Sequence, residues 1–252
     1  MKEIAYAKIN LALHVRSREA DGYHRIETVF AFCEDGDVLS ASEADALSLE
    51  VSGPFAGALA GEPDNLVLQA ARALGRNLAF TLDKRLPVAA GLGGGSADAA
   101  AALRMLGGGA EFAARLGADV PACMLSQTAR GTGRGDVIEP VEIAGLRGTP
   151  VLLVNPGIPL STAAVFKAWD GVDRGPLGDW EEGRNDLQAA AIALVPEIAE
   201  VIDALAGARI ARMSGSGATC FGLYASEAER DAAAARIAAA RPGWWLCQTG
   251  LR

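Results

Sequence analysis

The sequence has few cysteines, and they are not arranged as pairs. Cys33, Cys123, Cys220 and Cys247 are scattered over 252 residues without a Cys-x-x-Cys motif. Such spacing disfavours a disulfide framework or a cysteine metal site, and is typical of small buried residues in a reducing compartment. We therefore expect a cytoplasmic protein whose cysteines neither bind metal nor form disulfides.

The sequence also lacks long hydrophobic runs. No apolar run approaches the about 20 residues that a membrane-spanning helix needs, and Met1–Val15 lacks the apolar block and cleavage site of a signal peptide. The net charge of −8 argues against a general nucleic-acid binder. With 50% hydrophobic and 21% charged residues, the chain is typical of a globular protein with one large or two intimate domains. We expect neither a membrane nor a nucleic acid as a partner.

Two familiar nucleotide-binding motifs are missing, although the chain is rich in glycine. Leu86–Ala99 reads LPVAAGLGGGSADA and precedes an Ala- and Leu-rich run that predicts a helix, with Ser96 near its N-terminal end. The loop has no Gly-Lys-Ser/Thr ending, which excludes a P-loop, and both G-x-G-x-x-G frames fail. A glycine-rich loop before a helix still offers free N–H groups to an anion. We interpret it as a phosphate-binding loop, with a flexible turn as the alternative.

Strand and helix patterns are mixed without a regular βαβ repeat, which favours an α+β fold over a doubly wound sheet. Strands are predicted at Ala7–Arg16, on both sides of a polar turn within Glu27–Ser40, and at Ala46–Val51, Leu78–Leu82, Pro150–Val154, Thr219–Tyr224 and Trp244–Thr249. Helices are predicted at Asn65–Leu74 and directly after the glycine-rich loop, and a second short helix is predicted to end at Leu116. Further helices are predicted at Ser161–Trp169, from Asn185 to Leu205 with a break near Pro196, and at Glu227–Ala240.

Three further places carry residues with possible chemistry. Lys8 and Asn10 share one side of the first strand, where the alternative is an exposed polar edge. Tyr23 and His24 lie in a turn that could bind a flat ring or be ordinary surface. Asp119 stands between a glycine and a proline at a helix border, where the alternative is a helix cap. His14 is interpreted as structural.

Three segments in this order resemble the three motifs of the GHMP kinases, the superfamily of galactokinase and of homoserine, mevalonate and phosphomevalonate kinases. They are Ala7–Leu11, Leu86–Ala99 and Met213–Ala218. ADGYH at 20–24, GADVP at 117–121 and Asn185–Leu187 are similar to one branch of this family, whose substrate carries a cytidine diphosphate. The match extends over nearly the whole chain.

The resemblance implies an α+β fold of two domains with the active site in the cleft between them. Residues 1–148 would form a half similar to domain 2 of ribosomal protein S5, with the ATP phosphate loop, and residues 149–252 a ferredoxin-like half. It implies transfer of the γ-phosphoryl group of ATP, with Mg²⁺, to a hydroxyl of a small cytidine diphosphate substrate. The metal ligands stay unassigned, and the protein would be a monomer or a homodimer.

Carried over position by position, the resemblance implies that Asp119 is the catalytic base and Lys8 its charge partner. Asn10, Tyr23, His24, Thr162 and Phe166 fall on the substrate side, with Tyr23 and His24 around the cytosine. The residues that match the ATP phosphate loop are Pro87, Val88, Ala89, Ala90, Gly91, Leu92, Gly93, Gly94, Gly95, Ser96 and Ala97.

The sequence departs from the family pattern at Tyr6, where proline is usual, and at Ala97, where some relatives have a second serine; Gly107–Phe112 is shorter than expected. Three alternatives stay open. A kinase for homoserine or a mevalonate would share the loop but would need no cytosine pocket. A non-catalytic ligand-sensing relative would lack Asp119, and a nucleic-acid-binding protein would share only the N-terminal fold.

Overall fold

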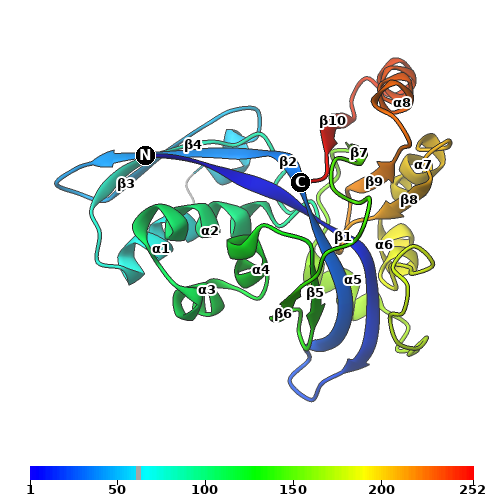
Figure 1. Cartoon of the computed structure of the whole chain (residues 1–252), viewed down its shortest axis with the longest axis horizontal. Coiled ribbons are helices and arrows are strands. Elements are labelled where there is room, and N and C mark those ends of the chain that lie inside the picture. Colours follow the sequence, from blue (N-terminus) through cyan, green and yellow to red (C-terminus); the bar gives the residue numbers. More distant parts are fainter. Residues whose placement is uncertain (61–63) are drawn as a thin grey trace.

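One long hairpin organises the N-terminal part of the chain, of which the computed structural model describes residues 1–60 and 64–252. β1 (Lys2–Arg18) and β2 (His24–Glu43) pair antiparallel along their length, and both cross most of the molecule (Figure 1). Four shorter strands complete this sheet. β4 (Leu78–Asp83) pairs with the end of β2, and β3 (Ser48–Ser52) runs parallel to β4. β5 (Ala129–Thr132) pairs with the first half of β2, and β6 (Val137–Pro140) pairs with β5.

The prediction of a polar turn within Glu27–Ser40 is wrong, because β2 is one continuous strand through this segment. The pairing with β1 shifts register there, from Lys8 opposite Phe32 to Tyr6 opposite Gly36. A bulge of this kind absorbs extra residues without ending the strand. Gly36 allows the close approach, since a Cβ at this position would lie 2.0 Å from the Ala5 carbonyl oxygen.

Helices lie on one side of this sheet, three of them against its strands and one, at residues 110–116, packed on the other three (Figure 1). They are α1 (Leu66–Ala73), α2 (Gly94–Leu106), α3 (Ala110–Leu116) and α4 (Val120–Leu125), and a 3₁₀ turn, η1, spans Ala56–Leu59. Alanines fill the middle of α2 and are fully buried, so this helix packs closely on β1. The helix after the glycine-rich loop is confirmed: it begins at Gly94, and Ser96 is its third residue, near the N-terminal end as predicted.

The C-terminal part is a second sheet with its own helices. The antiparallel strand order is β10 (Trp245–Gly250), β7 (Pro150–Asn155), β9 (Cys220–Leu223) and β8 (Ile210–Met213). The strand β8 is missing from the prediction, because its four residues directly precede the small-residue loop and are too few to show an alternating pattern. The helices are α5 (Thr162–Ala168), α6 (Gln188–Leu194), α7 (Glu197–Ala204) and α8 (Glu227–Ala240), and the predicted break at Pro196 is confirmed. The structure is thus a mixed α+β fold, as expected.

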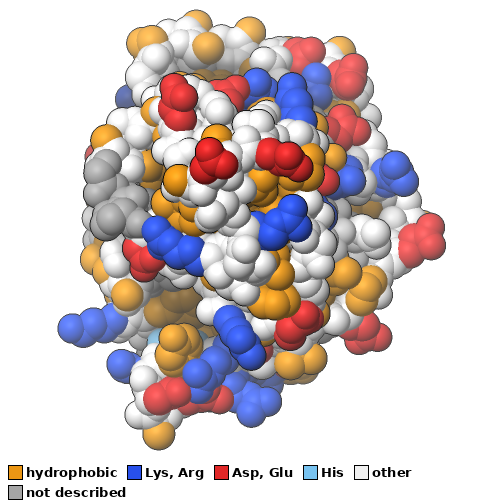
Figure 2. All heavy atoms as spheres, turned by 90° about the vertical axis from the view of Figure 1, so that its left-hand side faces the viewer, with side chains coloured by type: hydrophobic (Ala, Val, Ile, Leu, Met, Phe, Trp, Pro, Cys, Tyr) orange, Lys and Arg blue, Asp and Glu red, His pale blue; other side chains and the backbone are white. Residues whose placement is uncertain are grey.

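The two sheets share a core along β1. Ile9 and Leu11 are fully buried in the same cluster as Val151, Leu153 and Phe221. The predicted division at residues 148 and 149 falls between β6 and β7, and it stays a prediction. On the end that carries β3 and α1, acidic and basic side chains are interspersed with apolar ones (Figure 2). Within residues 1–60 and 64–252, no helix is both long and apolar enough to cross a membrane.

Candidate active site

A glycine-rich loop leads into α2 in a conformation that needs glycine. Gly91 and Gly93 have φ values of 76° and 62°, in the left-handed region that side chains disfavour. A Cβ on Gly91 would lie 2.3 Å from the Ser214 carbonyl oxygen. Gly93 is the N-cap of α2, so Gly94, Gly95 and Ser96 form its first turn. The N–H groups of a first turn have no partner within the helix, and together with the helix dipole they favour an anion.

The small-residue loop after β8 packs against this glycine-rich loop. The Ser214 hydroxyl donates to the Gly91 carbonyl oxygen at 2.8 Å, and the Thr219 N–H donates to the Ala90 carbonyl oxygen at 3.2 Å. Asn185 holds the far side of the same segment, because its amide donates to the carbonyl oxygens of Met213 and Gly215, each at 2.8 Å. The two glycine-containing loops are therefore in direct contact.

A lysine and a carboxylate meet beside the glycine-rich loop. The Nζ of Lys8 lies 3.3 Å from Oδ2 of Asp119 and donates to Oδ1 of Asn10 at 3.1 Å. The Asn10 amide in turn donates to the Thr28 hydroxyl at 2.8 Å, which fixes its orientation. Lys8 is buried, and its ammonium also lies 4.7 Å from the centre of the Phe30 ring. The alternative of an exposed polar edge is wrong for Lys8 and Asn10.

Asp119 occupies the N-cap of α4, yet its side chain makes no capping hydrogen bond. The carboxylate is instead 40% exposed beside the Lys8 ammonium, within the lining of the cavity. A capping role does not explain this residue. An exposed carboxylate beside a buried cation can accept a proton from a hydroxyl that binds next to it.

An aromatic corner lies where the β1–β2 turn meets α5. The ring centres of His24 and Phe166 are 4.9 Å apart. Nε2 of His24 is buried without a hydrogen-bond partner, and burial together with the charge of Arg18 lowers the pKa of this imidazole. Tyr23 is 58% exposed, and the Arg134 guanidinium lies 4.2 Å from its ring centre. The Thr162 and Ser216 hydroxyls are hydrogen-bonded at 2.8 Å.

These groups line one cavity of about 900 Å³ between the two halves. Of the predicted site residues, it brings together Lys8, Asn10, Tyr23, His24, Ala89, Ala90, Gly91, Gly93, Gly94, Gly95, Ser96, Asp119, Thr162 and Phe166. Pro87, Val88, Leu92 and Ala97 are not among its lining residues, and Leu92 and Ala97 are buried in the core. Sequence reasoning missed Arg18, Arg134 and Lys167, which add positive charge to the lining. The sequence offered only their positions as a signal: Arg18 and Lys167 lie near predicted site residues, and Arg134 lies in the glycine-containing segment RGTGRGD at 130–136.

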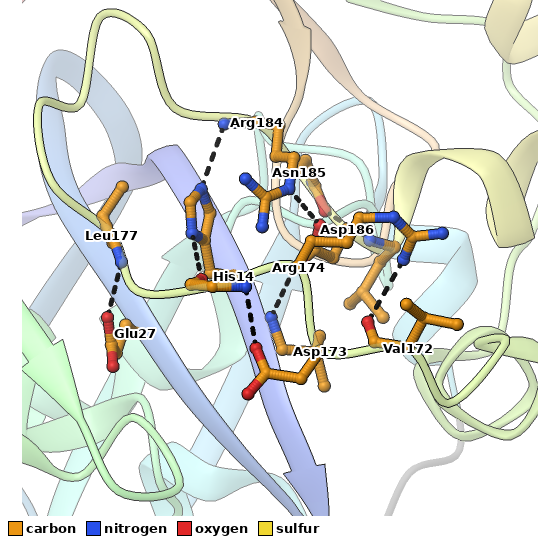
Figure 3. A network of polar contacts seen from close by, with 12 residues as sticks. His14, Glu27, Val172, Asp173, Arg174, Leu177, Arg184, Asn185 and Asp186 are labelled. Atoms are coloured by element: carbon orange, nitrogen blue, oxygen red, sulfur yellow. Dashed lines mark hydrogen bonds and ion pairs between the residues drawn. The ribbon is translucent and has the colours of Figure 1, made fainter.

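A polar network fixes the chain that follows α5 (Figure 3). His14 on β1 bonds at Nδ1 to the Gly175 carbonyl oxygen at 3.1 Å, and Nε2 accepts the Arg184 N–H at 3.4 Å. Oδ2 of Asp186 accepts the Val15 N–H at 2.8 Å, and Oε2 of Glu27 accepts the Leu177 N–H at 2.6 Å. His14 therefore has partners at both ring nitrogens, which agrees with its predicted structural role.

Comparison with known proteins gives the same family over both halves. The model described as the GHMP kinases N terminal domain matches residues 65–127, and that described as GHMP kinases C terminal matches residues 171–242. The 4-diphosphocytidyl-2-C-methyl-D-erythritol kinase of Rhizorhabdus wittichii is 56% identical, over 99% of this chain and 94% of that protein. The enzyme of the same name from Novosphingobium aromaticivorans is 54% identical, over 100% and 93%.

Solved structures show the same fold. A crystal structure of 4-(cytidine 5'-diphospho)-2C-methyl-D-erythritol kinase superposes with a TM-score of 0.83 at 32% identity, over 99% of both chains. The L. major mevalonate kinase in complex with R-mevalonate superposes with a TM-score of 0.70 at 16% identity, over 100% of this chain and 96% of that one. At that identity the second match is a likeness of fold alone.

Proposed function

Because this chain belongs to the GHMP kinases, and within them to the 4-diphosphocytidyl-2-C-methyl-D-erythritol kinases, we propose that it phosphorylates that compound. The reaction transfers the γ-phosphoryl group of ATP to the 2-hydroxyl of the methylerythritol unit and releases ADP. It is a step in the non-mevalonate route to isoprenoid precursors. We propose a cytoplasmic enzyme that acts as a monomer or a homodimer.

The observation that carries this proposal at the site is the arrangement of Lys8, Asp119 and the first turn of α2 around one cavity. Phosphoryl transfer requires positioning and charge neutralisation more than covalent catalysis. The N–H groups of Gly94, Gly95 and Ser96 would hold the ATP phosphates. Lys8 would neutralise charge next to the transferred group.

Asp119 would orient the acceptor hydroxyl and take its proton as the hydroxyl attacks the γ-phosphorus. A general base of this kind contributes about 10²–10⁴-fold to the rate. Its exposed carboxylate and its freedom from capping support this role. Lys8, held by Asn10, would keep the carboxylate in place between turnovers.

The cytosine would bind in the corner formed by Tyr23, His24 and Phe166. An unpartnered buried imidazole nitrogen can form a hydrogen bond with a polar heterocycle, and aromatic rings favour stacking on it. Thr162 would contribute a hydroxyl on the same side. A homoserine or mevalonate substrate would leave this corner unused, so the corner favours the cytidyl substrate.

We further propose that Mg²⁺ accompanies ATP. Mg²⁺ is usually bound by substrate phosphates and water together with one or two carboxylates. Within residues 1–60 and 64–252, no cluster of three or more His, Cys, Asp and Glu side chains could hold a metal ion. The ion would neutralise phosphate charge, and we assign no protein ligand to it.

The test is phosphate transfer from ATP to 4-diphosphocytidyl-2-C-methyl-D-erythritol, with homoserine and mevalonate as competing acceptors. We expect turnover with the cytidyl compound alone. Turnover with homoserine or mevalonate instead would contradict the substrate assignment and keep the fold and the phosphate loop. A lack of turnover with all three would favour a non-catalytic ligand-sensing protein.

A further inference from the structure

A buried ion triad lies beneath the phosphate loop. The Nζ of Lys84 lies 2.5 Å from Oδ2 of Asp37 and 2.7 Å from Oδ2 of Asp98. The three side chains are between 0% and 3% exposed. They come from three different segments: Asp37 from β2, Lys84 from the residue after β4, and Asp98 from the first half of α2.

The triad holds the chain where the phosphate loop starts. The second oxygen of Asp37, Oδ1, accepts the N–H groups of Arg85 at 2.6 Å and of Leu86 at 2.9 Å. Lys84 lies directly under the other end of the loop, because a Cβ on Gly94 would lie 3.0 Å from its Nζ. A single ammonium therefore connects the residues that start the loop with the helix turn that ends it.

Burial of an ion triad is, in general, weak evidence for a gain in folding stability. Three buried charges lose their hydration, and apolar residues of similar volume often stabilise a protein at least as well. Oδ1 of Asp98 is also buried without a hydrogen-bond partner. Burial, followed by the charge of Asp37, raises the pKa of the Asp98 carboxyl to about 7 despite the neighbouring lysine. A costly buried cluster next to a ligand site is better explained by the geometry that it fixes.

We propose that Lys84, Asp37 and Asp98 are positioning residues for the nucleotide: they hold the first turn of α2 so that its N–H groups face the phosphates. Asp98 on α2 forms an ion pair with Lys84, and Asp37 pairs with Lys84 and accepts hydrogen bonds from the N–H groups at the start of the loop. Neither carboxylate lines the cavity, so the effect passes through the backbone of the loop. The inference rests on the proposed function, since it assumes that ATP binds at this turn.

The experiment compares two replacements of Asp98. Asp98→Ala removes the tie between α2 and Lys84 but leaves the Lys84–Asp37 pair neutral and intact. We expect the Kd of a non-hydrolysable ATP analogue and the KM for ATP to rise about tenfold, because small displacements of positioning groups carry such costs. The KM for the cytidyl acceptor should stay within about twofold, and Asp98→Asn, which keeps an acceptor for Lys84, should restore most of the nucleotide affinity.

Leu103→Ala is the matched control, because Leu103 is fully buried on the same helix, belongs to the hydrophobic core and does not line the cavity. It should lower the melting temperature and leave the Kd of the ATP analogue unchanged. If Asp98→Ala does not fold, Asp98→Ser carries the same expectation. The proposal is overturned if Asp98→Ala binds the analogue as the wild type does, or if Leu103→Ala loses equal affinity. Because analogue binding needs no turnover, failure of the cytidyl acceptor assay would refute the proposed function without deciding this one.

Discussion

The ammonium of Lys8 and the carboxylate of Asp119 lie 3.3 Å apart, on a buried strand and at the start of a short helix that are distant in the chain. Lys8 is hidden from solvent, whereas the Asp119 side chain is 40% exposed. The Asp119 carboxylate of the pair is therefore exposed at the cavity, whereas the Lys8 ammonium is almost completely buried next to it. This asymmetry suits a base that must reach a bound hydroxyl.

Replacing Asp119 tests the proposed base. Asp119→Asn removes the proton acceptor with little change in shape, and we expect kcat to fall about 10²–10⁴-fold while the KM for ATP changes little. Steady-state kinetics measure both quantities. Glu111→Gln, an exposed acid on α3 outside the cavity lining, should leave kcat unchanged. Nearly full activity in Asp119→Asn would assign proton removal to another group.

Replacing Lys8 tests the charge partner. Lys8→Met keeps most of the apolar stem that packs in the interior, and it leaves an exposed carboxylate, so the protein should still fold. Loss of a preorganised charge beside the transferred phosphoryl group should lower kcat about 10²–10³-fold. Lys8→Arg should recover part of the loss, because it restores a positive charge. Equal activity in Lys8→Met and the wild type would leave Lys8 with a packing role only.

The close approach of the two loops predicts a stability difference between two glycine substitutions. Gly91→Ala forces a Cβ to within 2.3 Å of a carbonyl oxygen at a φ of 76°, and we expect it to destabilise the fold by about 1–3 kcal/mol. Gly95→Ala meets only a Leu66 methyl at 3.8 Å within a helix, and should stabilise it or leave it unchanged. Urea unfolding followed by circular dichroism measures both. Equal stability of the two variants would contradict the packing described here.

The environment of His14 predicts a pH dependence of stability. Burial lowers the pKa of this imidazole below its usual 6.5, so the unfolded chain binds a proton more readily than the folded one. The stabilisation by neutral His14 is fully present above pH 6.5, and it is lost as the pH falls from there through the lowered folded pKa.

Replacement of His14 by glutamine measures how much this one imidazole contributes to the pH dependence of the free energy of unfolding. Urea unfolding should show a smaller loss of stability from about pH 7.5 to about pH 5 in His14→Gln than in the wild type. His24 has a lowered pKa for similar reasons, so His24→Gln is compared in parallel. An unchanged slope in His14→Gln would show that the contacts with Gly175 and Arg184 do not depend on a neutral ring.

The stacking of Arg134 on Tyr23 predicts an effect on the acceptor alone. Arg134 also pairs with Glu19 and Asp21, which links the β5–β6 turn to the β1–β2 turn. Arg134→Ala should raise the KM for the cytidyl substrate about two- to fivefold, as expected for an exposed cation–π contact, without changing the KM for ATP. Arg174→Ala removes a comparably exposed arginine, paired with Asp170 outside the cavity lining, and should change neither. A change in the KM for ATP would place Arg134 on the nucleotide side.

Local sequence patterns predict those elements of the fold whose conformation depends mainly on residues close by in the sequence. The glycines before an alanine-rich run predict a loop and a helix because backbone freedom and helix propensity are properties of short segments. The break at Pro196 follows from proline chemistry in the same way. The continuous β2 could not be predicted, because its polar middle is held by residues far away in the sequence: Gly36 and Asp37 pair with β1, and the Asp35 N–H donates to the Thr249 hydroxyl at 3.3 Å.

The sequence by itself determined the residue types of the site: a glycine-rich anion loop, a lysine two positions from an asparagine, a Tyr-His turn and an acid at a helix border. Tertiary structure decided which of these residues meet. It placed the Asp119 carboxylate next to Lys8 without a capping hydrogen bond, and it buried Lys84 between Asp37 and Asp98. The physical reason is that ion pairing and burial depend on distances between segments far apart in the chain, and the packing of the two halves around β1 sets those distances.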